Sequence, residues 1–82
     1  MNINVYVKTG CPWCLGVTEL LKKHGIQFKE INVTENQKAF DEMTQKSGQS
    51  KTPVVEIDEH LLIDTDAGEV EGYLREQKIL VD

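Results

Sequence analysis

The stretch INVYVKTGCPWCLG, residues 3–16, contains the only two cysteines of this 82-residue chain. Its first part, residues 3–8, is rich in β-branched and aromatic residues and predicts a strand. Apolar residues then recur with helical spacing from about Pro12 to Leu21, and Gly25 is typical of a helix end. The two cysteines are therefore expected where a strand passes into a helix.

The next part of the chain repeats this alternation. Residues 26–33 alternate in polarity and predict a second strand. The sequence TENQ at residues 34–37 has the form of a capping box and predicts the start of a second helix. That helix is expected to direct Phe40 and Met43 inward and to end near Gly48.

The last third predicts a hairpin and a helix. Residues 54–57 form a short apolar run, residues 59–60 are expected at the tip of the hairpin, and residues 61–63 form the returning strand. Asp66, followed three residues later by Glu69, predicts the N-cap of a final helix.

The predicted order is therefore β-α-β-α-β-β-α. A strand, a crossover helix and a second strand form a right-handed parallel unit, and the closely linked third and fourth strands must be antiparallel. This order resembles the thioredoxin-like α/β fold, a four-stranded mixed sheet flanked by three helices. We expect residues 1–82 to form a single domain of this kind.

Composition limits the function classes. The net charge of −5 argues against nucleic acid as a partner, because phosphate binding needs a concentrated positive surface. No apolar run is long enough to predict a membrane segment or a signal peptide. We therefore expect a cytoplasmic monomer, in a compartment where cysteines stay reduced unless they are catalytic.

The spacing of the cysteines suits redox chemistry. Pro12 is favoured at the first helical position, which makes Cys11 the N-cap with its sulfur near the amides of Trp13 and Cys14. These amides, the helix dipole and the nearby Lys8 favour a thiolate, so Cys11 is expected to be a nucleophile of lowered pKa. Cys14, one turn inside the helix, is expected to be shielded and to resolve a mixed disulfide on Cys11.

The same residues are compatible with other interpretations. A structural zinc site needs four ligands, and only His24 and His60 remain as nitrogen ligands without partner spacing, so we expect no metal. Two inert buried thiols would not require a proline at the helix start. Trp13 could contact substrate or fold over the start of its helix, and the Thr52–Pro53 bond could be cis or belong to a plain strand-start proline.

Four segments, YVKTGCPWC, EMTQKSG, KTPVVEID and DTDAGEVEGYL, resemble dithiol glutaredoxins in order and spacing. The resemblance covers essentially the whole chain. It implies a thioredoxin-like fold with a cis proline at Pro53, Cys11 as the nucleophile, Cys14 as the resolving thiol and glutathione as a co-substrate.

The resemblance also implies a glutathione site. Lys8 would face the glycine carboxylate, Trp13 would lie beside the ligand, and Thr52 would pair with the cysteinyl backbone. The γ-glutamyl end would be held by Asp66 and its neighbour Thr65.

Several positions depart from the family pattern. Ile63 and Asp64 replace a glycine pair, Ala67 replaces the second of two acidic residues, and Phe40 stands where a basic residue is common. Asp64 also places negative charge where an anionic glutathione would bind. Each difference is expected to weaken glutathione binding without affecting the thiol chemistry.

The expected function is reduction of protein disulfides or of glutathione mixed disulfides by a thiol–disulfide oxidoreductase. Glutathione could supply the electrons, or a thioredoxin-reductase-type flavoenzyme could do so if the glutathione site is degraded. An alternative is a glutathione-dependent module that binds a [2Fe–2S] cluster, which Pro12 and Trp13 disfavour because most cluster binders have a smaller or more flexible loop there.

Overall fold

A computed structural model describes residues 2–79, so the outermost residues of the expected domain lie outside the described part. The elements follow the predicted order, which confirms the fold class. They are β1 (Ile3–Val7), α1 (Pro12–Lys23), β2 (Lys29–Asn32), α2 (Gln37–Ser47), β3 (Val54–Ile57), β4 (His60–Ile63) and α3 (Ala67–Glu76).

The four strands form one mixed sheet in the order β2-β1-β3-β4. β1 is parallel to β2, with Val7 opposite Asn32, and antiparallel to β3. The pair β3 and β4 is an antiparallel hairpin. Because β1 and β2 are parallel, the carboxyl end of β1 and the loop that follows it lie at the same edge of the sheet as the carboxyl end of β2.

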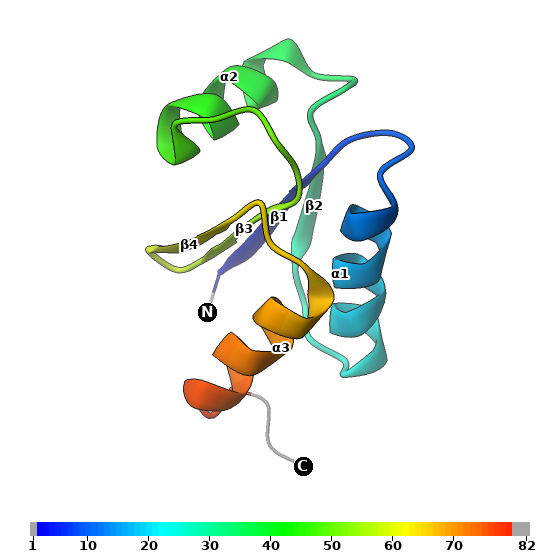
Figure 1. Ribbon diagram of the computed structural model, residues 1–82, viewed down its shortest axis with the longest axis vertical. Coiled ribbons are helices and arrows are strands. Elements are labelled where there is room, and N and C mark those ends of the chain that lie inside the picture. Colours follow the sequence, from blue (N-terminus) through cyan, green and yellow to red (C-terminus); the bar gives the residue numbers. More distant parts are fainter. Residues whose placement is uncertain (1, 80–82) are drawn as a thin grey trace.

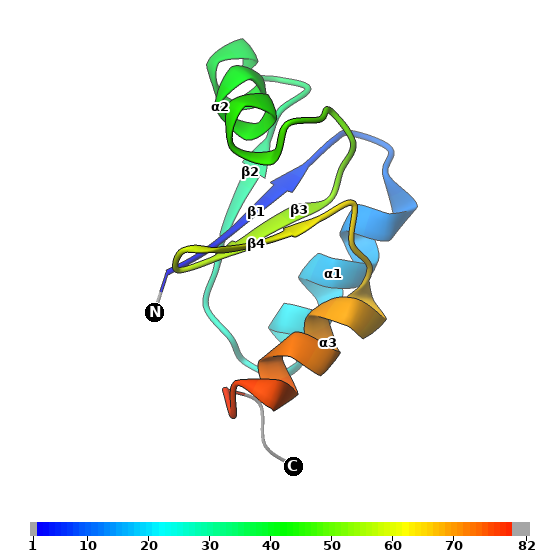
Figure 2. The ribbon, with the colours of Figure 1, turned by 60° about the vertical axis from the view of Figure 1, so that its left-hand side comes forward.

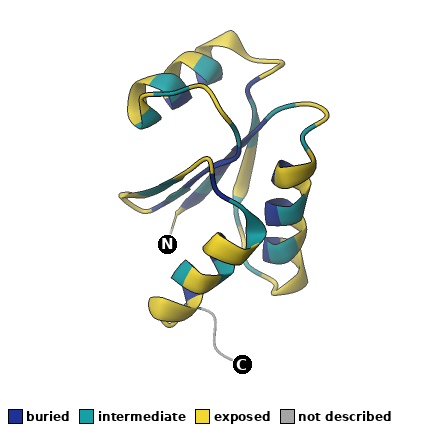
Figure 3. Ribbon diagram, in the orientation of Figure 1, coloured by how far each residue is buried: buried dark blue, intermediate teal, exposed yellow. Residues whose placement is uncertain are grey.

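Helices cover both faces of the sheet (Figures 1 and 2). α1 and α3 lie against one face, where Val17, Leu21 and Leu74 pack on Val5 and Val55 of the sheet. On the other face, α2 packs on the sheet and forms the second core cluster with it. This cluster consists of Tyr6, Val33, Ala39, Met43 and Val54. Figure 3 shows the outer sides of the helices exposed, whereas the central strands β1 and β3 are largely buried and the edge strands β2 and β4 are more exposed.

The second strand is shorter than predicted, because its first residues cap α1. Gly25 has a φ of +67°, and its N–H donates to the carbonyl of Lys22 over 3.1 Å. The N–H of Ile26 donates to the carbonyl of Leu21 over 2.9 Å. This pair of bonds is a Schellman motif, which holds the backbone at Ile26 against the helix and delays the strand to Lys29.

Other predicted boundaries were also wrong by one or two residues, and β1 ends at Val7 rather than at residue 8. Asn36, rather than Thr34, is the N-cap of α2, because the hydroxyl of Thr34 accepts the N–H of Thr9 while Asn36 accepts the N–H of Ala39. His60 belongs to β4 and pairs with Ile57, so the hairpin turn consists of residues 58–59. The predicted end of α2 is confirmed, since Gly48 is its left-handed C-cap.

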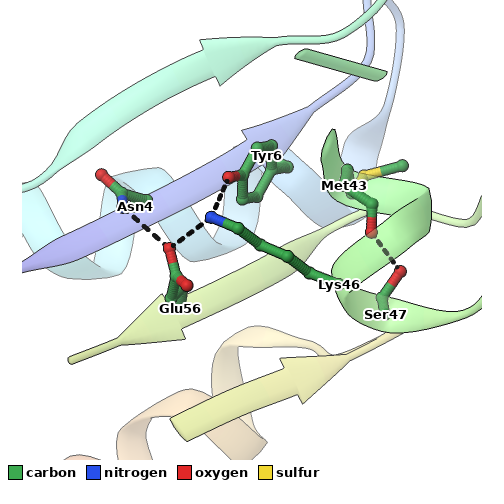
Figure 4. A network of polar contacts seen from close by, with 6 residues as sticks. All are labelled: Asn4, Tyr6, Met43, Lys46, Ser47 and Glu56. Atoms are coloured by element: carbon green, nitrogen blue, oxygen red, sulfur yellow. Dashed lines mark hydrogen bonds and ion pairs between the residues drawn. The ribbon is translucent and has the colours of Figure 1, made fainter. Parts of the chain in front are cut away.

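A polar network fastens α2 to the sheet (Figure 4). The ammonium of Lys46 donates to the hydroxyl of the buried Tyr6 over 3.1 Å and lies 3.3 Å from the carboxylate of Glu56, which also accepts from Asn4. The hydrogen bond to Tyr6 is the largest of the effects that raise the pKa of Lys46. Within residues 2–79 no helix is long and apolar enough to cross a membrane.

Candidate active site

The two cysteines lie where β1 leads into α1, as predicted. Gly10 has a φ of +76°, a conformation that glycine adopts at little cost, and it lets the chain turn toward the helix. Cys11 is the N-cap of α1 and Pro12 follows in the first turn. The N–H of Cys14 donates to Sγ of Cys11 over 3.2 Å, which places this sulfur at the positive end of the helix.

The sulfurs of Cys11 and Cys14 are joined in a disulfide, and their Cα atoms are 5.3 Å apart. The two residues differ in exposure. Cys11 is half-buried, whereas Cys14 is only 3% exposed and belongs to the core cluster beneath α1 and α3. An incoming group therefore meets the sulfur of Cys11 first.

The loop between α2 and β3 approaches the disulfide. The hydroxyl of Thr52 lies 3.6 Å from Sγ of Cys11 and donates to it. The Thr52–Pro53 bond is cis, as the family resemblance implied. Pro53 is buried, and its carbonyl accepts the N–H of Thr65 over 3.3 Å, which joins this loop to the segment that precedes α3.

Four of the predicted site residues line one hollow of about 250 Å³ beside the disulfide. We call it the Trp13–Thr52 hollow; its lining consists of Trp13, Thr52, Asp64, Thr65 and Asp66. Trp13 is 64% exposed, so it is accessible to an incoming molecule. The carboxylate of Asp66 accepts the N–H of Glu69 over 2.8 Å, which confirms the predicted N-cap of α3.

Trp13 also borders an open, more apolar hollow of about 480 Å³. Its lining consists of Pro12, Trp13, Gly16, Asp66, Ala67 and Gly68, from the starts of α1 and α3. The two helices approach closely here, because a Cβ at Gly16 would lie 3.8 Å from the Cβ of Ala67. The indole thus stands between a polar and an apolar surface.

Lys8 does not line the Trp13–Thr52 hollow. Its ammonium donates to the carbonyl of Ser50 over 2.8 Å and lies 5.9 Å from the centre of the Phe40 ring. These contacts tie the end of β1 to the loop that carries Thr52. Lys8 therefore supports the loop that carries Thr52 from outside the Trp13–Thr52 hollow, and its role toward a ligand stays a prediction.

Lys8 instead borders a third hollow of about 230 Å³ that also reaches both cysteines. Thr18 of α1 and Glu30 and Asn32 of β2 line it and were not predicted as site residues. The predicted parallel pairing of the first two strands could have indicated the residues from β2, because the carboxyl ends of parallel strands meet at one edge of a sheet.

No metal centre accompanies the cysteines within residues 2–79, where no three residues among His, Cys, Asp and Glu are grouped to hold an ion. His24 is exposed at the C-cap of α1. His60 stacks on Tyr73, with ring centroids 4.3 Å apart and planes within 5°.

The glutaredoxin family model matches residues 3–62, a span that contains the disulfide and the cis proline. The chain belongs to the glutaredoxin family. It is 35% identical over 72 residues to an uncharacterised glutaredoxin-like 8.6 kDa protein in a rubredoxin operon of Clostridium pasteurianum, covering 88% of this chain and 96% of that protein.

Another relative of this glutaredoxin-family chain is glutaredoxin 3 of Escherichia coli K12, with 33% identity over 57 residues, 70% of this chain and 69% of that one. Among solved structures, a mutant of the thioredoxin-like protein BC3987 superposes with a TM-score of 0.81 at 26% identity, covering 89% of this chain and 99% of that one. The family membership and the cysteine pair identify a thiol–disulfide oxidoreductase.

Proposed function

We propose that this chain reduces disulfides through a two-thiol cycle in which Cys11 is the nucleophile and Cys14 the resolving thiol. The observation that carries the proposal is the asymmetry of the pair. Cys11 is accessible and accepts the amide of Cys14 at the start of α1, whereas Cys14 is almost fully buried. The amide and the helix dipole stabilise negative charge on the sulfur of Cys11.

The cycle starts from the reduced dithiol. The thiolate of Cys11 attacks one sulfur of a substrate disulfide, forms a mixed disulfide and expels the first substrate thiolate, which takes a proton from solvent. The sulfur of Cys14 then attacks Cys11, gives up its proton to solvent and expels the second substrate thiolate. Two electrons have passed to the substrate, and the chain is left with the Cys11–Cys14 disulfide of the present structure.

The surroundings of Cys11 suit this exchange. The hydroxyl of Thr52, 3.6 Å from Sγ of Cys11, can donate to whichever thiolate is forming there. In the proposal, Trp13 and Thr52 hold the substrate beside the sulfur, and Thr65 and Asp66 contact its far end. The buried cis Pro53 acts through the backbone by fixing the position of Thr52. Lys8 acts indirectly, by holding the loop that carries Thr52.

The substrates that we propose are protein disulfides and glutathione mixed disulfides. Re-reduction of the Cys11–Cys14 disulfide needs an external two-electron donor. Glutathione, two molecules of which become glutathione disulfide, is the donor implied by the family, and a thioredoxin-reductase-type flavoenzyme is the alternative. Asp64 in the hollow and the engagement of Lys8 at Ser50 favour the alternative, because glutathione is anionic.

Trapping of the mixed disulfide tests the roles of the two thiols. We expect Cys14→Ser, incubated with an excess of a peptide disulfide, to accumulate a one-to-one adduct on Cys11 that mass spectrometry resolves. The matched variant Cys11→Ser is expected to form no adduct on the same timescale, because Cys14 is buried. An adduct on Cys14 in Cys11→Ser that forms as fast as the adduct on Cys11 would contradict the assignment.

A further inference from the structure

The Trp13–Thr52 hollow beside the disulfide is negatively charged. Its lining consists of Trp13, Thr52, Asp64, Thr65 and Asp66, so two residues carry carboxylates and none carries a positive charge. The hollow is only about 250 Å³ in volume. A molecule bound in this hollow therefore lies close to both carboxylates and interacts with their negative charge.

The carboxylate of Asp64 is available to a substrate. Asp64 is exposed, follows directly on β4 and has a φ of +51°, a left-handed conformation that Asp and Asn tolerate better than most residues. Within residues 2–79 its side chain has no hydrogen-bond or ion-pair partner. Asp66 differs, because its carboxylate already caps the N–H of Glu69.

The lysines nearest in sequence to Cys11 and Thr52 do not neutralise the negative charge of this hollow. The ammonium of Lys8 is bound to the carbonyl of Ser50 and lies over the ring of Phe40. Lys51 precedes Thr52, yet it is exposed and does not line the hollow. The amino end of α3 would attract an anion, but the carboxylate of Asp66 occupies that position as the helix cap.

We propose that Asp64 is a specificity-determining residue, which makes the site selective for disulfides whose cysteine lies beside positively charged groups. The substrate class is a peptide or protein segment with Lys or Arg next to the reacting cysteine, and anionic disulfides react more slowly. The inference rests on the proposed function and leaves its chemistry unchanged: two electrons pass from the Cys11–Cys14 dithiol, and the substrate leaves as two thiols. Opposite charges raise the rate of encounter and stabilise the mixed disulfide.

Three matched peptide disulfides test the proposal. Each is the symmetric disulfide of an acetylated, amidated pentapeptide in which the cysteine is flanked on both sides by Lys, by Gln or by Glu. Reduced protein is mixed with an excess of each, and its oxidation is followed by the fluorescence of Trp13, the only tryptophan of the chain. The rate of each peptide with dithiothreitol corrects for the intrinsic reactivity of its sulfurs.

We expect the corrected rate for the Lys peptide to exceed that for the Glu peptide by about tenfold at low ionic strength, and this ratio to fall as salt screens the charges. Asp64→Asn keeps the backbone conformation and is expected to reduce the ratio by about threefold. Asp58→Asn is the matched control, because Asp58 is also exposed, has a φ of +53° and lies in the turn between β3 and β4. It changes the net charge by the same amount and is expected to leave the ratio unchanged.

The possible outcomes distinguish failure of the charge preference from failure of the proposed function. If the Gln peptide oxidises the protein and the two charged peptides react equally fast after correction, the inference is wrong and the proposed function stands. Equal effects of Asp64→Asn and Asp58→Asn on the ratio would also overturn it, since net charge alone would then explain the preference. If the Gln peptide fails to oxidise the protein, the proposed function fails and the inference fails with it.

Discussion

Replacement of Asp66 by Ala is expected to affect both stability and turnover, because this one carboxylate caps α3 and lines the Trp13–Thr52 hollow. The variant loses a 2.8 Å hydrogen bond to the N–H of Glu69, which is worth about 1 kcal/mol for an N-cap. It also loses a negative charge at the helix start, worth about 0.5 kcal/mol. The expected loss is about 1.5 kcal/mol, or a fall in Tm of about 6–12 °C for a domain of this size.

Two matched variants separate the contributions. Asp66→Asn retains an oxygen that can accept the N–H of Glu69 and removes only the charge, so we expect a loss of about 0.5 kcal/mol. Asn36→Ala removes the equivalent cap of α2, a 3.1 Å bond to the N–H of Ala39, and is expected to lose about 1 kcal/mol. α2 lies on the face of the sheet opposite to α1 and α3 (Figure 2), away from the Trp13–Thr52 hollow.

Urea unfolding of the three variants gives the stability changes, and single-turnover oxidation by the uncharged Gln peptide disulfide gives the rates. We expect Asp66→Ala to slow oxidation, whereas Asn36→Ala lowers stability by a similar amount and oxidises at the unaltered rate. If Asn36→Ala slowed oxidation as much as Asp66→Ala, the effect would reflect general destabilisation. An unchanged unfolding free energy in Asp66→Ala would refute the capping argument itself.

Two further predictions concern stability. Lys46→Met is expected to lose about 0.5–1 kcal/mol at pH 7, a modest amount because the side chain of Lys46 is 41% exposed to screening solvent. The pKa of Lys46 is raised from 10.5 in the folded state. The contribution of Lys46 to the free energy of unfolding is therefore fully present below pH 10.5 and disappears as the pH rises through the folded-state pKa. An undiminished difference between variant and parent in urea unfolding at pH 12 would contradict this. Leu74→Ala empties a fully buried position between the helices and the sheet and is expected to lose about 2–5 kcal/mol in the same measurement, against a total of roughly 4–12 kcal/mol for a chain of this length. A loss below about 1 kcal/mol would mean that the core closes around the missing side chain.

Much of the fold could be predicted because the deciding signals are local. Pro12 beside Cys11 specifies a helix start, Asp66 with Glu69 specifies another, and Gly48 specifies a helix end. Each signal depends on hydrogen bonds between a backbone group and a side chain or backbone group only a few positions away. Such bonds form in the same way wherever the segment lies in the fold.

The errors occurred where a side chain or amide had a choice of partners. Thr34 could have capped α2, but its hydroxyl accepts the N–H of Thr9 from the loop after β1, and Asn36 caps instead. Ile26 could have begun a strand, but its amide completes the cap of α1. A single sequence does not reveal which of several competing partners lies within reach.

The sequence by itself determined the chemistry of the cysteine pair, because Cys11, Pro12 and Cys14 form their geometry within one helical turn. Only the tertiary structure decided what surrounds the pair. Thr52 reaches the sulfur from a loop 41 residues away in sequence. Asp64 and Asp66 join Trp13 around one hollow because β3 pairs with β1 and β4 pairs with β3 in the sheet. The charge that an incoming disulfide meets is therefore a property of packing between distant segments, where strand order sets which side chains become neighbours.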